Sequence, residues 1–244
     1  MTTSDAATWG DSVELGTDGS MLRTLTPAHH RGTVLVLPGG GYVMRADYEA
    51  DPVAQWLAGL GIASGVVDYA VPPQDPDALL ASVRTAVTLV RDADPAHGPV
   101  GVLGFSAGGH LAGLTGTRAS GPERPDALML CYPGISLVRR ASDPPTLRLL
   151  PSPFTGREEE FSLELRVDST TPPTFTWHTS DDEMLDVDNL YHLAQAYAAA
   201  KVPLSLHVFP HGRHGLGLAT DNPTVGAWTT LCAQWLRDLS FGTA

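Results

Sequence analysis

The feature that most constrains this chain is the pentapeptide GFSAG at residues 104–108, which matches the pattern G-x-S-x-G. An apolar run, residues 100–105, leads into it, and a run of small residues, 107–113, follows Ser106. A nucleophilic serine needs this setting, in which a strand turns sharply into a helix. Flanking glycines avoid clashes at such a turn, and the helix N-terminus favours negative charge beside the serine. The alternative is a glycine-rich turn in which the serine is incidental.

Apolar segments of strand length and of helix length alternate after residue 30. This alternation is typical of βαβ units, in which helices join parallel strands across the faces of a sheet. The sequence therefore predicts an α/β fold with a mostly parallel, twisted sheet and helices on both faces. Residues 1–30 are expected to add one or two antiparallel strands at the sheet edge. The predicted strands are 33–37, 62–69, 100–105, 127–132, 174–178 and 203–209, and the predicted helices are 51–60, 75–92, one from 106 or 107, 187–200 and 224–239.

The stretch 137–171 breaks the alternation. It is irregular, with prolines at 144, 145, 151 and 153 and a run of three glutamates at 158–160. Because it lacks the apolar residues for a core of its own, we expect an excursion over the sheet near the active site. Residues 1–244 are thus predicted to form a single domain without a large cap.

Composition limits the partners and the compartment. The net charge of −12 argues against nucleic acid and anionic membrane surfaces, since neutralising phosphates needs basic clusters. No apolar run approaches the roughly 18 residues of a membrane span. The first five residues show no secretory signal, so a cytoplasmic chain is expected. Cys131 and Cys232 lie in apolar surroundings and are predicted to be buried free thiols.

Three consecutive glycines follow the predicted strand 33–37, in PGGGY at residues 38–42. Such a run suits a loop whose backbone N–H groups approach a ligand closely. Acyl transfer needs donors of this kind for its tetrahedral oxyanion, and the predicted donors are the N–H groups of Gly40, Gly41 and Ala107. A phosphate-binding loop is the alternative, but it would continue with Lys and Ser or Thr, whereas Tyr-Val-Met follows here.

A serine nucleophile needs an adjacent base that a carboxylate orients. The chain order expected in this setting is Ser, then Asp or Glu, then His. His211 and His214 lie in a glycine-bounded loop after the last predicted strand. We favour His214, which Gly215 follows. His110, one helical turn beyond the serine, is expected to be structural.

The acid is expected after the preceding strand, where residues 178–183 read His-Thr-Ser-Asp-Asp-Glu. Asp181, Asp182 and Glu183 are the candidates. We favour Asp182, although chain order alone does not separate the two aspartates.

A zinc site is the alternative use of these residue types. No His-Glu-x-x-His pair on a helix accompanies them, so neither a metal nor another cofactor is expected. The alternative zinc ligands would be His178, Asp181, Asp182, His211 and His214.

Cys131 is not expected to be a nucleophile, because no sharp strand-to-helix turn of the G-x-S-x-G kind surrounds it.

These motifs resemble the α/β-hydrolase superfamily, and more narrowly the bacterial esterase/lipase proteins grouped with acetylxylan and feruloyl esterases. The resemblance covers about residues 30–220 and implies the α/β-hydrolase fold. It also implies a triad of Ser106, His214 and an acid four positions after His178, which is Asp182. The matching segments are 38–42, 45–49, 104–111, 171–182 and 209–218.

The chain departs from the family pattern at several positions. Tyr48 stands where the pattern often has His, and Leu185-Asp186 where it often has Val-Pro. Pro38 precedes the glycines, where lipases of the hormone-sensitive type carry His and a long N-terminal cap. These departures leave the substrate open.

The residues and the resemblance together lead us to expect a serine carboxylesterase for short acyl esters, from acetyl to butyryl. Its alcohol side is expected to accept bulky groups such as the sugars of xylan. Tyr42, Arg45 and Glu49 are predicted to contact substrate hydroxyls at the mouth of the site, with ordinary packing as their alternative. Arylformamidases, lactonases and small-peptide hydrolases use the same triad, and a non-catalytic binding module is a further alternative.

Overall fold

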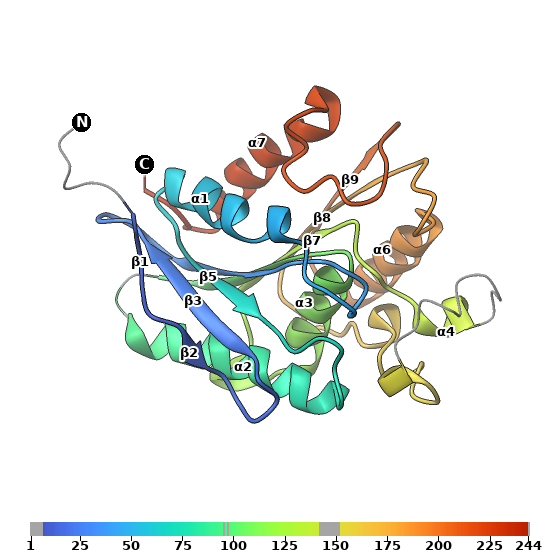
Figure 1. Cartoon of the computed structure of the whole chain (residues 1–244). Coiled ribbons are helices and arrows are strands. Elements are labelled where there is room, and N and C mark those ends of the chain that lie inside the picture. The colour runs from blue at the N-terminus through green and yellow to red at the C-terminus, as the bar shows by residue number, and fades with distance from the viewer. Residues whose placement is uncertain (1–6, 95, 97, 142–151, 244) are drawn as a thin grey trace.

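The computed structural model describes residues 7–94, 96, 98–141 and 152–243. Its strands are β1 (Thr8–Trp9), β2 (Val13–Glu14), β3 (Met21–Thr26), β4 (Thr33–Leu37), β5 (Ala63–Asp68), β6 (Val100–Phe105), β7 (Ala127–Cys131), β8 (Thr174–Thr179) and β9 (Leu204–Phe209). Within the described chain they form a nine-stranded sheet in the order β1-β3-β5-β4-β6-β7-β8-β9, with β2 paired to β3 (Figure 1). Strands β4 to β9 run parallel to one another, and β3 is antiparallel to β5.

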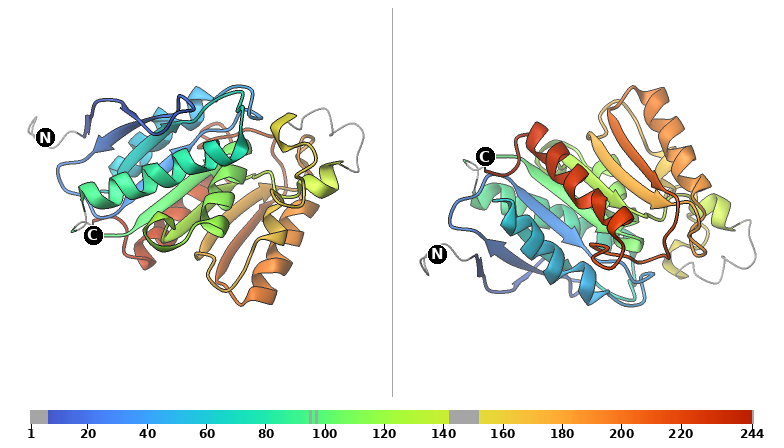
Figure 2. Two further views of the ribbon diagram at one scale, coloured as in Figure 1. Left: turned by 90° about the horizontal axis from the view of Figure 1, so that it is seen from below. Right: turned by 90° about the horizontal axis from the view of Figure 1, so that it is seen from above.

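Helices cover both faces of the sheet (Figure 2). The main ones are α1 (Asp51–Gly59), α2 (Pro76–Ala93), α3 (Ala107–Arg118), α6 (Asp188–Ala200) and α7 (Pro223–Asp238). Apolar side chains of α1 and α7 share one core cluster, and those of α2, α3 and α6 share another on the opposite face. Parallel strands between two such layers must be apolar on both sides, which explains why residues 34–37 of β4 are all buried.

Local capping signals set the starts of two of these helices. The Asp75 side chain accepts a hydrogen bond from the Asp77 N–H at 2.9 Å, and the Asn222 side chain accepts one from the Val225 N–H at 3.2 Å. Proline follows each cap at the first helical position. A backbone N–H at that position has no acceptor within the helix, so the missing N–H of proline costs no hydrogen bond.

The α/β architecture predicted from the sequence is confirmed, with the boundaries of the central strands and helices within one residue. The N-terminal prediction is corrected: among the described residues before β4 there are three antiparallel strands, where one or two were expected. Two of them, β1 and β2, have two residues each, which is too short for an alternating pattern to be visible.

The predicted irregular stretch 137–171 is described only in part. It holds the short helix α4 (Leu137–Ala141) and 3-10 helices at Ser152–Phe154 and Leu163–Leu165. Residues 142–151, with the prolines at 144, 145 and 151, lie outside the described residues.

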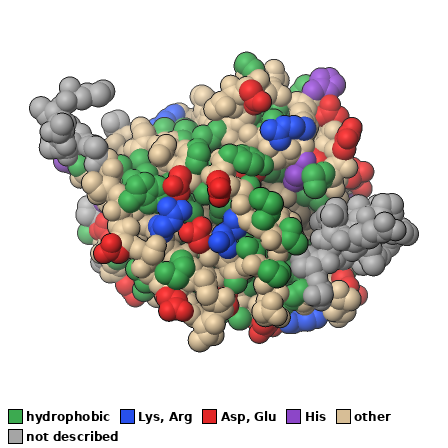
Figure 3. All heavy atoms as spheres, viewed as in Figure 1, with side chains coloured by type: hydrophobic (Ala, Val, Ile, Leu, Met, Phe, Trp, Pro, Cys, Tyr) green, Lys and Arg blue, Asp and Glu red, His purple; other side chains and the backbone are tan. Residues whose placement is uncertain are grey.

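The composition led to expectations about surface charge, membrane spans and the two cysteines, and the structure can be compared with each. On the face shown in Figure 3, acidic and basic side chains are interspersed with apolar ones. None of the helices described is both long and apolar enough to cross a membrane. Cys131 and Cys232 are buried free thiols, as predicted, and burial raises the pKa of each thiol.

Candidate active site

Ser106 lies in the turn between β6 and α3. Its backbone has φ 51° and ψ −114°, a strained conformation for a residue with a side chain. A Cβ added at Gly104 would lie 2.1 Å from the Gly108 carbonyl oxygen, and one at Gly108 would lie 2.1 Å from the Leu37 carbonyl oxygen. Both glycines of the motif are therefore required by the close approach of β6, α3 and β4.

Hydrogen bonds join Ser106, His214 and Asp182, which follow three parallel strands at the same edge of the sheet. His214 Nε2 lies 2.8 Å from Ser106 Oγ, and His214 Nδ1 lies 2.6 Å from Asp182 Oδ2. The other carboxylate oxygen accepts the N–H groups of Met184 at 2.8 Å and Leu185 at 3.0 Å. The loop backbone thus fixes the carboxylate that orients the imidazole.

The environment of Asp182 keeps its carboxyl group ionised. Burial alone would raise its pKa, but hydrogen bonding and charge from His214, together with the N–H groups of Leu185 and Met184, outweigh burial. The pKa therefore lies below the ordinary value of 3.8. A buried anion beside His214 Nδ1 favours a proton there and leaves Nε2 as an acceptor for the serine hydroxyl.

A second aspartate–histidine pair lies at the surface beside this one. His211 Nδ1 is 3.0 Å from Asp181 Oδ2, and the Gly212 N–H donates to Asp181 Oδ1 at 2.7 Å. The His211 side chain is 85% exposed. The structure therefore separates the candidates left open by chain order: His214 contacts both Ser106 and Asp182, whereas Asp181 and His211 pair with each other.

His178 is buried behind Asp182 and does not reach the serine. Its Nδ1 contacts the Thr179 backbone, and its Nε2 lies 3.9 Å from Asp182 Oδ2. Burial lowers its pKa, which favours the neutral ring. Over the described part of the chain, no cluster of three or more His, Cys, Asp or Glu residues could hold a metal ion.

The glycine loop after β4 turns back on itself beside Ser106. Gly40 has φ 129° and Gly41 has φ 64°, and a Cβ on Gly40 would lie 2.2 Å from the Met44 carbonyl oxygen. No described residue accepts a hydrogen bond from the N–H groups of Gly40, Gly41 or Ala107. All three residues line the cavity that contains Ser106, so these N–H groups are available to a bound ligand.

Glu49 holds this loop from inside the protein. Its side chain is 1% exposed and accepts hydrogen bonds from the Gly39 N–H at 2.7 Å and from the Tyr132 hydroxyl. That hydroxyl also accepts the Gly217 N–H at 2.7 Å, and the Tyr132 ring lies edge-on to His214 at 5.1 Å. Glu49 borders the cavity that contains Ser106, but its two oxygens accept these hydrogen bonds within the protein, and its contact with substrate hydroxyls stays a prediction. Sequence reasoning missed Tyr132 altogether.

Tyr42 lines the cavity, but its hydroxyl group is already hydrogen-bonded within the protein. The hydroxyl lies 2.7 Å from His110 Nδ1, and His110 Nε2 lies 2.7 Å from the Phe161 carbonyl oxygen. His110 therefore has the structural role predicted for it, linking the glycine loop to the segment that follows α4. We expect Tyr42 to shape the cavity and not to bind substrate hydroxyls.

Arg45 is not among the residues that line the cavity, and its contact with the substrate stays a prediction. Its guanidinium donates to the Tyr69 carbonyl oxygen at 2.6 Å and lies 3.6 Å from an Asp68 carboxylate oxygen. The end of β5 thus draws the side chain away from Ser106.

The cavity that contains Ser106, hereafter the Ser106 cavity, has a volume of about 420 Å³. Apolar side chains form much of its wall, and three of them, Val43, Met44 and Met184, are more than half exposed. Leu137, the first residue of α4, also lines this cavity. No local sequence pattern marks these wall residues, because only the sheet order brings their segments together.

No protein-family model matches the chain. Along its full length, and along the full length of the other chain, it is 36% identical to an acetyl ester-xyloside bifunctional hydrolase from Caldicellulosiruptor lactoaceticus. The two structures superpose with a TM-score of 0.84. The chain belongs to the bacterial esterases of the α/β-hydrolase superfamily.

Two curated relatives of this α/β-hydrolase are longer than it is. Endo-1,4-beta-xylanase B of Butyrivibrio fibrisolvens is 33% identical over 213 residues, which cover 78% of this chain and 33% of the relative. Acetylxylan esterase of Xylanibacter ruminicola is 31% identical over 245 residues, which cover 93% and 49%. The α/β-hydrolase thus spans about a third and about half of their lengths.

Proposed function

We propose that this α/β-hydrolase is a serine carboxylesterase that hydrolyses short-chain acyl esters, with acetyl esters of sugars as its substrate class. The observation that carries the proposal is the hydrogen-bonded series from Ser106 through His214 to Asp182 in an open cavity. The names of two relatives, an acetyl ester-xyloside hydrolase and an acetylxylan esterase, support the substrate class.

In the first proposed step, Ser106 Oγ attacks the ester carbonyl carbon while His214 Nε2 takes the hydroxyl proton. The charge that develops on the carbonyl oxygen is stabilised by the N–H groups of Gly40, Gly41 and Ala107. Collapse of the tetrahedral intermediate breaks the bond to the alcohol, and His214 returns the proton to the leaving oxygen. The acyl group remains on Ser106.

In the second step, water attacks the acyl carbon and gives a proton to His214. The bond to Ser106 Oγ then breaks, and His214 returns the proton to the serine, so the acid leaves and the enzyme is restored. Asp182 stays ionised throughout and stabilises the imidazolium in both steps.

The decisive test is Ser106→Ala assayed on p-nitrophenyl acetate. Loss of the nucleophile should lower kcat by about 10⁴- to 10⁶-fold, and a variant that keeps most of its activity contradicts the proposal. Comparing kcat/KM on acetate esters, a lactone, N-formylkynurenine and aminoacyl amides distinguishes the esterase from the other hydrolases that use this triad.

A further inference from the structure

A second cavity, of about 110 Å³, opens beside the Ser106 cavity and shares part of its wall. We refer to it as the α4–α6 cavity, because residues at the starts of these two helices line it. The shared wall residues come from the segments that follow β7 and β8 and are Gly134, Leu137, Met184 and Leu185. These four shared residues place the two cavities side by side.

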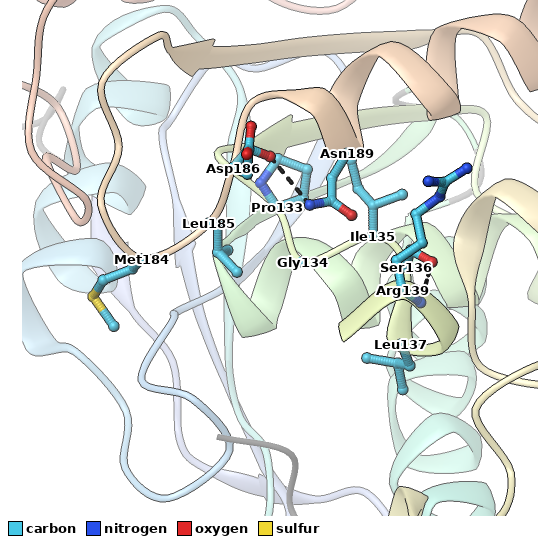
Figure 4. A pocket seen from close by; sticks show the side chains of 10 residues that line it. All are labelled: Pro133, Gly134, Ile135, Ser136, Leu137, Arg139, Met184, Leu185, Asp186 and Asn189. Carbon is cyan, nitrogen blue, oxygen red and sulfur yellow. Dashed lines mark hydrogen bonds between the residues drawn. The ribbon is translucent and has the colours of Figure 1, made fainter. Parts of the chain in front are cut away.

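Polar side chains line part of the α4–α6 cavity, among apolar ones. Asp186 just precedes α6, Asn189 lies in its first turn, and Arg139 reaches the cavity from α4 (Figure 4). Asp186 Oδ1 accepts the Asp188 N–H at 2.9 Å, and Asn189 Nδ2 donates to the Asp186 main-chain oxygen at 3.2 Å. These bonds orient both side chains. The other carboxylate oxygen of Asp186 and the amide oxygen of Asn189 accept no hydrogen bond from the described residues.

The backbone holds this cavity in a fixed place relative to the proposed triad. On one wall, the N–H groups of Met184 and Leu185 donate to Asp182. On the other wall, the Leu137 N–H donates to Ser162 Oγ at 2.9 Å. A group bound in the α4–α6 cavity therefore lies at a defined position with respect to the proposed nucleophile, as productive binding requires.

We propose that the α4–α6 cavity binds one neutral pyranose ring of the leaving alcohol. Ring hydroxyls can pair with Asn189 and Asp186, while Ile135 and Leu185 offer apolar surface to the C–H groups of the ring. An acyl chain fits poorly there, because its methylenes would remove water from the polar groups without replacing the lost hydrogen bonds. This inference rests on the proposed function and specifies the side of the ester that enters this part of the cleft.

The test uses two substrates that share an acetyl group and differ in the alcohol. One is p-nitrophenyl acetate, which carries no sugar, and the other is a monoacetylated methyl β-D-xylopyranoside. We expect Asn189→Ala to lower kcat/KM on the xyloside about 5- to 30-fold and to leave p-nitrophenyl acetate within about twofold. Asp186→Asn keeps an oxygen for the Asp188 N–H and should act in the same direction. Gln195→Ala, exposed on the same helix, is the matched control and should change neither substrate.

Product inhibition gives an independent measurement. Xylobiose should compete with p-nitrophenyl acetate in the wild type and should bind less tightly to Asn189→Ala. The inference is overturned if xylobiose does not inhibit the wild type, or if Asn189→Ala changes neither the xyloside kinetics nor the inhibition. An equal loss on both substrates also overturns it, because Asn189 would then support the fold or the triad. Failure of the proposed function is a different result, in which the wild type hydrolyses neither acetate.

Discussion

Replacing Glu49 by glutamine tests how the glycine loop is held. The wild-type carboxylate accepts two buried donors, the Gly39 N–H and the Tyr132 hydroxyl. Glutamine has the same shape but only one acceptor oxygen, so one donor loses its partner. An unsatisfied buried polar group costs about 1–3 kcal/mol, and we expect the free energy of unfolding to fall by about that amount. Glu49→Ala leaves both donors unpaired and should cost about twice as much.

The pKa of Glu49 gives this substitution a characteristic pH dependence. Burial is the largest influence on the carboxyl group and outweighs the hydrogen bonds from Tyr132 and Gly39, so its pKa in the folded chain lies above the ordinary 4.5. A carboxyl group whose pKa is raised on folding contributes stability below its unfolded pKa and loses it as the pH rises through the folded value. The advantage of the wild type over Glu49→Gln should therefore be largest at acid pH and smallest at neutral pH.

The assay combines urea unfolding at acid and neutral pH with kcat/KM on p-nitrophenyl acetate. Since Gly39 leads into the proposed oxyanion donors and Tyr132 holds the Gly217 N–H, we expect Glu49→Gln to lower kcat/KM by about tenfold or more. Glu159→Gln, at an exposed position, is the control. The reasoning is refuted if Glu49→Gln matches the wild type in its free energy of unfolding at both pH values and keeps its kcat/KM.

Three further predictions concern the acid, the nucleophile turn and the acyl group. Asp182→Asn should lower kcat by about 10⁴-fold, because an amide donor favours the wrong imidazole tautomer, while Asp181→Asn should stay within a few-fold; equal effects on p-nitrophenyl acetate hydrolysis would contradict the assignment. Gly108→Ala should prevent folding or abolish activity, since its Cβ would lie 2.1 Å from the Leu37 carbonyl oxygen, whereas a Cβ at Gly59 meets nothing within 4 Å. Circular dichroism and soluble yield of Gly108→Ala and Gly59→Ala check this, and equal stability of the two variants would be inconsistent with it. Finally, kcat/KM over a series of p-nitrophenyl esters should peak between acetyl and butyryl and fall beyond hexanoyl, and a rise through octanoyl would refute the short-acyl preference.

Local signals explain why the central elements and the serine turn were predictable. The strand that ends at Phe105, the small residues after Ser106 and the glycines on either side all lie within one short segment. The chain order then limits the candidates for the base and for the acid, but it does not separate Asp181 from Asp182. Only the loop geometry separates the two aspartates, because His211 pairs with Asp181 whereas His214 contacts Asp182.

The roles of Glu49 and Arg45 depend on contacts that no local pattern encodes. Glu49 is buried because the glycine loop and Tyr132, 83 residues away, supply donors for its carboxylate. Arg45 follows the glycine loop in sequence, but Asp68 at the end of the neighbouring strand attracts its guanidinium. In both cases a charged residue close to the motif in sequence makes its polar contacts within the protein.

The central claim is that Ser106 is an activated nucleophile that forms a covalent intermediate. Intact-mass spectrometry after treatment with an organophosphonate p-nitrophenyl ester tests it directly, because an activated serine forms a stable oxygen–phosphorus bond and releases p-nitrophenolate. We predict one adduct per chain, located at Ser106 by peptide mapping, and no adduct in Ser106→Ala or His214→Ala. An unmodified wild-type chain, or an adduct that persists in Ser106→Ala, would contradict the account.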